Sequence, residues 1–410
     1  MSLIAPFKGL RPAPGKASAV LAPPYDVLNT EEAREMAGDK PWSFLHISKP
    51  EIDLPVGTDP YDDSVYAKGA ENFQHMIDEG VLVRDEMDCY YAYRITMGGH
   101  QQTGLVAGAS VAAYDRNDVR KHEYTRPKKE DDRVRQVDAL NAQTGPVFLT
   151  YKGHDIVDGI LKAASEDTPE VDVTLDDGVR HELWVINEAS VIQALTEAFD
   201  EMGVIYVADG HHRSAAASRV AGLRRADKSD PEASHEYFLT VIFPDHQMQI
   251  LDYNRVVKDL NDLDKTEFLQ RIRGSFNCDV SDAPVKPDAM GKFGMYLDGQ
   301  WYALGIQPDR VPDDPVKRLD VSVLADNLIA PLLDITDPRT DERIDFVGGI
   351  RGLEELERRV NSGEMAVAFS LYPTRIEDLM AVADDNQVMP PKSTWFEPKL
   401  ADGMVSKVLD

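Results

Sequence analysis

The feature that most constrains this chain is an apolar strand that ends abruptly in a polar turn and continues as a helix. In residues 204–222, VIYVADGHHRSAAASRVAG, the apolar run stops at Asp209 and Gly210, and a string of small residues follows Arg213. We predict a buried strand over 204–208 and a helix that begins near Arg213. Gly210 permits the tight turn between them because it has no Cβ atom.

This turn has the chemistry of an anion site. The first backbone N–H groups of a helix have no acceptor inside the helix, and the helix dipole is positive there. Gly210, His211 and Arg213 are therefore predicted to bind phosphate. Asp209 would repel phosphate, so we assign to it a metal ion or a hydroxyl proton, and His212 is a second candidate acid or base. The alternative is that Asp209 only caps the helix and that the histidines pack.

A second unusual segment, residues 119–140, gathers cations in a chain whose formal net charge is −28. Its first half is predicted to hold an anionic donor, with Glu123 as the base or a metal ligand. The later half also fits a solvated helix with ion pairs between residues four apart, from about residue 128. The predicted phosphate ligands of this segment are Lys121, His122, Thr125, Arg126 and Arg133.

Three further stretches carry weaker signals. Residues 389–400, MPPKSTWFEPKL, offer Lys392, Ser393 and Thr394 as phosphate ligands, although a hydroxyl there can also cap a turn. Residues 6–12 and 22–27 place a few polar side chains between prolines, which is equally typical of an ordinary loop and edge strand. The sequence has neither the Walker nor the Rossmann glycine pattern.

Helical and strand patterns alternate without a strict βαβ rhythm, so we predict an α+β fold with mixed sheets. With 410 residues the chain is long enough for two or three domains. We place an N-terminal part at 1–243 and a C-terminal part at 244–410 that contributes to the same site. The predicted strands of the first part include 89–96, 103–114, 145–151 and 237–243.

Composition narrows the possible partners. The net charge of −28 argues against broad nucleic-acid binding and favours small anionic substrates held in a local cationic pocket. Two cysteines and no long apolar run argue against a disulfide framework and a membrane span, so we expect a cytoplasmic protein. A homodimer is left open.

Five of these stretches together resemble the domain-of-unknown-function-1015 family of prokaryotic proteins: PFKGLRP, PPYDV, KHEYTRPKKEDDR, ADGHHRSAAA and MPPKSTWFEPKL. The DGHHR turn is also similar to the phosphate-binding turn of the ParB and sulfiredoxin superfamily, which includes kinases for free L-serine. The resemblance implies a ParB/sulfiredoxin-like core inside a larger scaffold. It also implies a phosphate turn in which Gly210, His212 and Arg213 take part.

The leading hypothesis is a phosphotransferase that moves a phosphoryl group from a nucleotide or pyrophosphate to a small hydroxyl acceptor, with free L-serine as the best candidate. Mg²⁺ would bridge the phosphate oxygens beside Asp209 or Glu123. Replacement of Arg213 by alanine is expected to abolish turnover and leave the fold intact. The alternatives are a non-catalytic nucleotide-binding regulator and a metal-dependent phosphoesterase.

Overall fold

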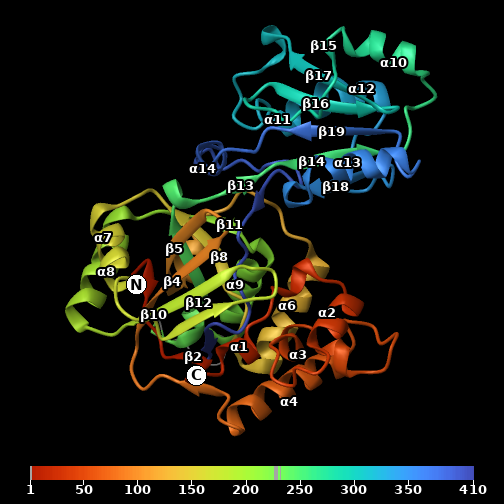
Figure 1. Ribbon diagram of the computed structural model, residues 1–410. Helices are drawn as coiled ribbons and strands as arrows, with labels where there is room; N and C mark the ends of the chain where they lie inside the picture. Colours follow the sequence, from red (N-terminus) through yellow and green to blue (C-terminus); the bar gives the residue numbers. More distant parts are fainter. Residues whose placement is uncertain (1, 226–229, 231) are drawn as a thin grey trace. The chain divides into compact units, whose positions relative to one another are not determined.

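The computed structural model describes residues 2–225, 230 and 232–410, and its chain forms two compact units (Figure 1). The first unit contains Met1–Met248 and Pro398–Asp410, and the second contains Gln249–Glu397. Mixed sheets and helices confirm the predicted α+β class. The predicted C-terminal part, 244–410, therefore differs from the second unit, because residues 244–248 and 398–410 belong to the first unit.

A mixed nine-stranded sheet is the centre of the first unit within the described residues. The strand order is β6 (Val119–Arg120), β11 (Ile205–Asp209), β8 (Val147–Tyr151), β12 (Tyr237–Pro244), β5 (His100–Ser110), β4 (Tyr90–Met97), β10 (Arg180–Ile186) and β9 (Val171–Thr174), with β1 (Ile4–Ala5) paired to β5. Strand β11 pairs in parallel with β6, β12 pairs in parallel with β8, and the other neighbours are antiparallel.

One predicted strand ends earlier than its apolar pattern indicated. We expected a strand over 103–114, but β5 stops at Ser110 and α5 (Val111–Asp115) follows. The Ser110 hydroxyl accepts a hydrogen bond from the N–H of Ala113 at 3.2 Å, which caps the new helix. Apolar residues cannot reveal this change because both the strand end and the helix are buried.

Helix α9 (His211–Arg225) leaves the end of β11 and packs against α5 and α6 (Pro127–Leu140). Its alanines at 216, 217 and 221 are buried, and small side chains let the helices approach closely. The other helices of this unit are α1 (Ala17–Val20), α2 (Thr30–Ala37), α3 (Leu45–Ser48), α4 (Asp63–Asp78), α7 (Asp155–Ala164) and α8 (Ala189–Met202).

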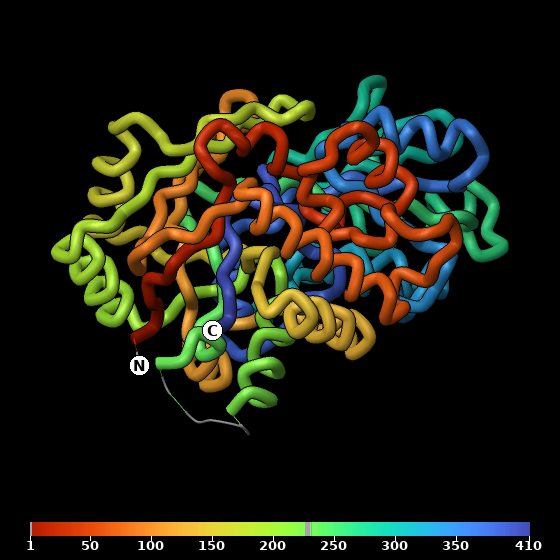
Figure 2. Tube along the Cα trace, turned by 90° about the horizontal axis from the view of Figure 1, so that it is seen from below, coloured from red at the N-terminus to blue at the C-terminus, as the bar shows by residue number. Residues whose placement is uncertain are grey.

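The two ends of the chain meet in a second sheet of the first unit. Its order is β3 (Leu82–Arg84), β2 (Gly9–Pro12), β21 (Ser406–Val408) and β7 (Ala142–Gln143). Figure 2 shows the C-terminal segment running beside the N-terminal segment, as the pairing of β2 with β21 requires.

The second unit is built on an antiparallel six-stranded sheet, counted over the residues that are described. Its order is β15 (Phe276–Ser281), β17 (Gln300–Ile306), β16 (Lys292–Leu297), β19 (Val367–Leu371), β14 (Tyr253–Val257) and β18 (Ile344–Gly348), and a pair is formed by β13 (Ile250–Leu251) and β20 (Trp395–Phe396). Its helices are α10 (Lys265–Ile272), α11 (Asp320–Leu324), α12 (Ala330–Leu333), α13 (Gly352–Asn361) and α14 (Ile376–Asp384), and a π-helical turn (Ala325–Ile329) joins α11 to α12. None of the helices in the described ranges has the length and apolar content needed to cross a bilayer.

Candidate functional site

The turn between β11 and α9 has the geometry that its sequence predicted. The register of β11 on β8 shifts between Val207 and Asp209, and Gly210 follows with a φ of 97°. A Cβ atom on Gly210 would lie 3.4 Å from the Cα atom of Val147. The helix starts at His211, two positions before the predicted start, so both histidines stand on its first turn.

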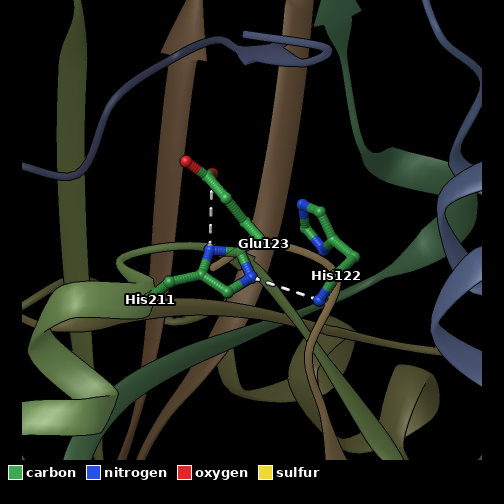
Figure 3. A group of neighbouring side chains, drawn as sticks. All are labelled: His122, Glu123 and His211. Carbon is green, nitrogen blue, oxygen red and sulfur yellow. Dashed lines mark hydrogen bonds and ion pairs between the residues drawn. The ribbon is translucent and has the colours of Figure 1, made fainter. Parts of the chain in front are cut away.

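The segment that contains Glu123 lies directly against this turn. The backbone N–H of His122 donates to Nε2 of His211 at 3.4 Å, and Oε2 of Glu123 lies 3.8 Å from Nδ1 of the same ring (Figure 3). The backbone N–H of Arg126 donates to Nε2 of His212 at 3.0 Å. The two segments meet because β6 and β11 are parallel neighbours, so their carboxyl ends reach the same edge of the sheet.

His122 and His211 are buried and neutral near pH 7. Burial lowers the pKa of His122 to about 4, while the Asp209 charge and a hydrogen bond to the backbone of Val207 oppose the shift. Burial, with the neighbouring His122, also holds the pKa of His211 well below its ordinary value. The rings meet edge to face, with centroids 4.4 Å apart. A neutral imidazole keeps one lone pair for a proton or a metal ion.

His212 uses one of its ring nitrogens to hold the chain in place. Because Nε2 accepts the N–H of Arg126, the neutral ring carries its proton on Nδ1. Burial and the charge of Lys129 lower the pKa of His212. This arrangement gives His212 a positioning role, and its predicted role as an acid or base stays a prediction.

Asp209 is ionised and already paired. Its Oδ2 atom lies 3.0 Å from Nζ of Lys399, and its Oδ1 atom accepts the N–H of Gly210 at 2.8 Å. Burial alone would raise the pKa of Asp209, but Lys399 and Arg213 hold it well below its ordinary value. A metal ion at Asp209 would compete with Lys399, which was not among the predicted site residues.

Arg213 and Arg133 converge on one cavity from two helices. Arg213 donates through Nη1 to the carbonyl of Pro146 at 2.6 Å and through Nη2 to Oδ2 of Asp26 at 3.0 Å. The ring centroid of Tyr25 lies 5.5 Å from the guanidinium carbon of Arg213 and 4.1 Å from that of Arg133. The cavity has a volume of about 40 Å³, which is room for a few water molecules.

The positive charge in this cavity is balanced by nearby carboxylates, of which Asp402 is buried. Asp402 lines the cavity beside Arg213, and Asp132 pairs with Arg133 at 2.6 Å. Burial raises the pKa of Asp402 to about 7, the positive charge of Arg213 opposes this shift, and Asp26 adds to it. The cavity therefore contains a carboxyl that changes its charge near neutral pH.

Two of the predicted phosphate ligands have partners inside the protein. The ammonium group of Lys121 donates to the carbonyl of Tyr114 at 2.9 Å and lies 4.0 Å from the centroid of that ring. The hydroxyl of Thr125 donates to Oε1 of Glu130. Their predicted contact with phosphate would require these bonds to be exchanged, and it stays a prediction.

The charged helix α6 uses part of its charge to bind α9. Arg219 of α9 lies 2.7 Å from Asp131 and 3.4 Å from Glu130 of α6. The sequence also fitted ion pairs within one solvated helix, whereas these ion pairs join α6 to α9. These contacts hold α6, and with it Arg133, against the helix that carries the turn.

The predicted ligands Lys392, Ser393 and Thr394 belong to the second unit. The hydroxyl of Ser393 donates to the carbonyl of Pro390 at 2.6 Å, which is the turn-capping alternative given for this stretch. The carbonyl of Lys392 accepts from Arg255 at 2.9 Å, and Thr394 immediately precedes β20. Their contribution to the phosphate site stays a prediction.

Sequence reasoning missed the partners that come from far along the chain. Asp26 is 187 residues from Arg213, and Lys399 is 190 residues from Asp209. The stretches 22–27 and 389–400, which contain Asp26 and Lys399, carry a weak local signal in their prolines and charged side chains. No local sequence pattern marks Asp402, because it is a single aspartate in a short terminal segment.

The comparisons with known proteins identify a family. The model of the family described as "Protein of unknown function (DUF1015)" matches residues 4–322. No match was found among the curated proteins.

Solved structures give only distant similarities. A free serine kinase in complex with AMP is 15% identical, with a TM-score of 0.32 over 72% of this chain and 86% of that chain. SbnI with a C-terminal truncation from Staphylococcus aureus is 9% identical, with a TM-score of 0.38 over 71% and 82%. A conserved hypothetical protein from Pyrococcus furiosus is 15% identical, with a TM-score of 0.33 over 74% and 95%. These similarities are too low to support an argument about function.

Proposed function

Because this chain belongs to the DUF1015 family, as its sequence motifs predicted, we propose its function from the chemistry of its own site. The chain is a phosphotransferase that moves a phosphoryl group from a nucleotide or pyrophosphate to a small hydroxyl acceptor, with free L-serine as the best candidate. The observation that carries this proposal is the direct contact of the Glu123 segment with the start of α9. A carboxylate thus stands beside the end of a helix that attracts phosphate.

The donor phosphates would lie at the start of α9. The N–H groups of His211 and His212 begin the helix there, whereas that of Arg213 already donates to the carbonyl of Gly210 at 2.9 Å, and the helix dipole favours an anion. Arg213 and Arg133 lie behind the turn, where Asp26 and Asp132 already offset part of their charge, and Arg126 stands at its edge. Phosphoryl transfer depends mainly on such positioning and on charge stabilisation, so this set of groups suits it.

Glu123 is the better of the two carboxylates to accept the hydroxyl proton. Both side chains are partly exposed, Glu123 by 45% and Asp209 by 37%, but Asp209 is held by Lys399 and has a lowered pKa. A carboxylate with a lowered pKa is a weaker base. Mg²⁺ would neutralise charge on the donor phosphates, whose oxygens and bound water would supply most of its ligands, so the proposed role of Glu123 as the base does not require it to bind this ion.

A phosphorus NMR assay tests this function. Purified protein is incubated with Mg²⁺ and L-serine, and ATP, ADP and pyrophosphate are offered in separate reactions. O-phosphoserine formed with one donor would support the kinase and identify the donor. Orthophosphate without phosphoserine would favour the phosphoesterase alternative. Unchanged donors that nevertheless bind would favour the nucleotide-binding regulator.

Replacement of Arg213 by lysine is expected to lower turnover at least about 100-fold, because lysine keeps the charge but loses the planar fork of donors. Lysine is a better test than alanine. Alanine would leave Asp26 and the buried Asp402 without their cation, so it would also destabilise the fold, which the sequence alone did not lead us to expect. Steady-state rates measure the loss, and circular dichroism checks the fold. Arg358→Lys, on the surface of α13, is the matched control, and equal rates for the two variants would reject the assignment.

A further inference from the structure

We propose that His122, Glu123 and His211 form a binding site for one divalent transition-metal ion of the Zn²⁺ or Mn²⁺ class. Each residue offers one ligand atom, and these atoms all lie within 4.8 Å of one another. Figure 3 shows the carboxylate of Glu123 and the two imidazole rings facing a common space. The site differs from the Asp209–Glu123 pair expected from the sequence.

The strongest evidence is an orphan nitrogen on His122. The side chain is only 2% exposed, and its Nδ1 atom has no hydrogen-bond partner among the described residues. The ring is hydrogen-bonded to the backbone of Val207, which leaves Nδ1 as the atom with the unused lone pair. A buried polar atom without a partner is costly, and a bound ion is one of the few explanations for it.

The hydrogen bond to Val207 also has the form of an outer-shell contact in a metal site. Histidine ligands commonly donate their second ring nitrogen to a carbonyl or carboxylate, which fixes the tautomer and the direction of the ring. The backbone group of Val207 that bonds to the His122 ring belongs to β11, the strand that also leads into the turn. His122 is therefore oriented before any ion arrives.

His211 and Glu123 complete the set. Nδ1 of His211 lies 3.8 Å from Oε2 of Glu123, close enough for both atoms to reach one ion with small side-chain rotations. Coordination through Nδ1 moves the ring proton to Nε2. In the present arrangement that nitrogen accepts the N–H of His122 at 3.4 Å, so metal binding gives up this long hydrogen bond and requires a small turn of the ring that separates the two N–H groups.

Two imidazoles and one carboxylate select a borderline transition metal. Imidazole suits Zn²⁺, Fe²⁺ and related ions, and the carboxylate also suits Mn²⁺, whereas Mg²⁺ prefers an all-oxygen shell and retains its water. Both rings are buried, and the neutral form of an imidazole is the one that binds metal. Three protein ligands, one of them half exposed, leave a coordination position open toward solvent.

The metal site stands on its own geometry and does not require phosphoryl transfer. If both proposals hold, Glu123 would bind the ion instead of serving as the base, the ion would lower the pKa of the acceptor hydroxyl, and His212 would be the remaining candidate to accept the proton. A protein that binds the metal but transfers no phosphate would retain this inference and lose only the proposed function. A protein that transfers phosphate but binds no metal at the three residues would support the proposed function and reject the metal site.

The test is direct metal binding by the untagged full-length protein. After treatment with a chelator, the protein is titrated with Zn²⁺, Mn²⁺ and Mg²⁺ by isothermal titration calorimetry. We expect one Zn²⁺ ion per chain, weaker binding of Mn²⁺ and the weakest binding of Mg²⁺. Absence of a stoichiometric Zn²⁺ site would overturn the proposal.

Variants locate the ion. Glu123→Gln removes one ligand from a half-exposed side chain and should weaken Zn²⁺ binding at least about tenfold. His122→Gln should weaken it further, and in the Co²⁺-loaded protein it should change the visible absorption bands. His246→Ala, at an exposed histidine outside the site, is the matched control. Equal Zn²⁺ affinity in the Glu123, His122 and His246 variants would reject the assignment even if the protein binds zinc elsewhere.

Discussion

Gly210 allows the chain to turn from β11 into α9, and the candidate site depends on that turn. Its φ of 97° is strained for any residue with a Cβ atom. Gly210→Ala is expected to lower the free energy of unfolding by roughly 1 to 3 kcal/mol, which urea denaturation would measure. Gly222→Ala on the same helix is the control. A Cβ atom there meets open space, so higher helix propensity should make that variant equally or more stable.

Asp320 makes the stability of the second unit depend on pH. Its Oδ1 atom accepts the N–H of Gly291 at 2.8 Å, while Oδ2 has no partner among the described residues. Burial raises the pKa of Asp320 to about 7, the bond from Gly291 opposes this shift, and Asp378 adds to it. The folded protein therefore keeps a proton that the unfolded chain releases near pH 4.

The sign of the effect follows from proton linkage. Between about pH 4 and 7 the folded state binds more protons, so the contribution of Asp320 is greatest at low pH and is lost as the pH rises through 7. Asp320→Asn should remove this dependence and stabilise the protein at pH 8 by about 2 to 4 kcal/mol. Thermal unfolding at pH 5 and pH 8 would show it. A variant that is less stable than the wild type at pH 8 contradicts the prediction.

At the scale of elements, helix boundaries follow local chemistry closely. Helix α2 begins with a capping box, in which Asn29 accepts the N–H of Glu32 at 2.9 Å and Glu32 accepts the N–H of Asn29 at 2.9 Å. Asn29→Ala should destabilise the protein by about 1 kcal/mol, because it removes the side-chain acceptor. Asn29→Asp keeps an acceptor and should retain nearly all of the stability. Equilibrium denaturation of the two variants would distinguish a capping effect from a general effect of substitution.

The candidate site is an assembly of element ends. β6 and β11 finish at the same sheet edge, and α6 and α9 bring their charged residues to it. The ion pairs of Arg219 with α6 fix the two helices to each other. A substitution that disturbs this helix pair would therefore move Arg133 relative to Arg213.

At the scale of the whole molecule, the two units differ in how the sequence builds them. The second unit is the continuous segment Gln249–Glu397, whereas the first needs residues from both ends of the chain. The fragment 249–397 is expected to unfold cooperatively by itself, because its six-stranded sheet and its core lie within that segment. The fragment 1–248 is expected to unfold without cooperativity, because it lacks β21 from the middle of the β3–β2–β21–β7 sheet. Thermal unfolding by circular dichroism would compare them.

A joined fragment is the control for this experiment. The N–H of Glu397 donates to the carbonyl of Gln249 at 3.2 Å, so the chain leaves and re-enters the first unit at neighbouring points. A short glycine-serine linker from residue 248 to residue 398 should therefore restore cooperative unfolding. If 1–248 already unfolds cooperatively, the C-terminal segment is not needed for that fold.

Local sequence patterns were enough to predict several strands and the turn of the candidate site. Alternation and apolar runs located strands such as β4, β8 and β12, and the change from an apolar run to Gly210 and small residues located the turn of the site. The motifs also indicated the family, which the family model confirmed. These features depend on interactions between near neighbours in the chain, and a sequence displays such interactions directly.

Only the tertiary structure decided which groups face one another. The start of α9 meets His122 and Glu123 because two short strands pair in parallel, and Lys399 reaches Asp209 because the chain returns from its C-terminal end. Residues 398–410 join the first unit for the same reason. Such contacts join residues far apart in sequence, and burial sets the protonation of the groups that they bring together. A local sequence pattern shows neither which side chains meet nor how deeply they are buried. The contacts and protonation states of the site are therefore set only when the chain folds.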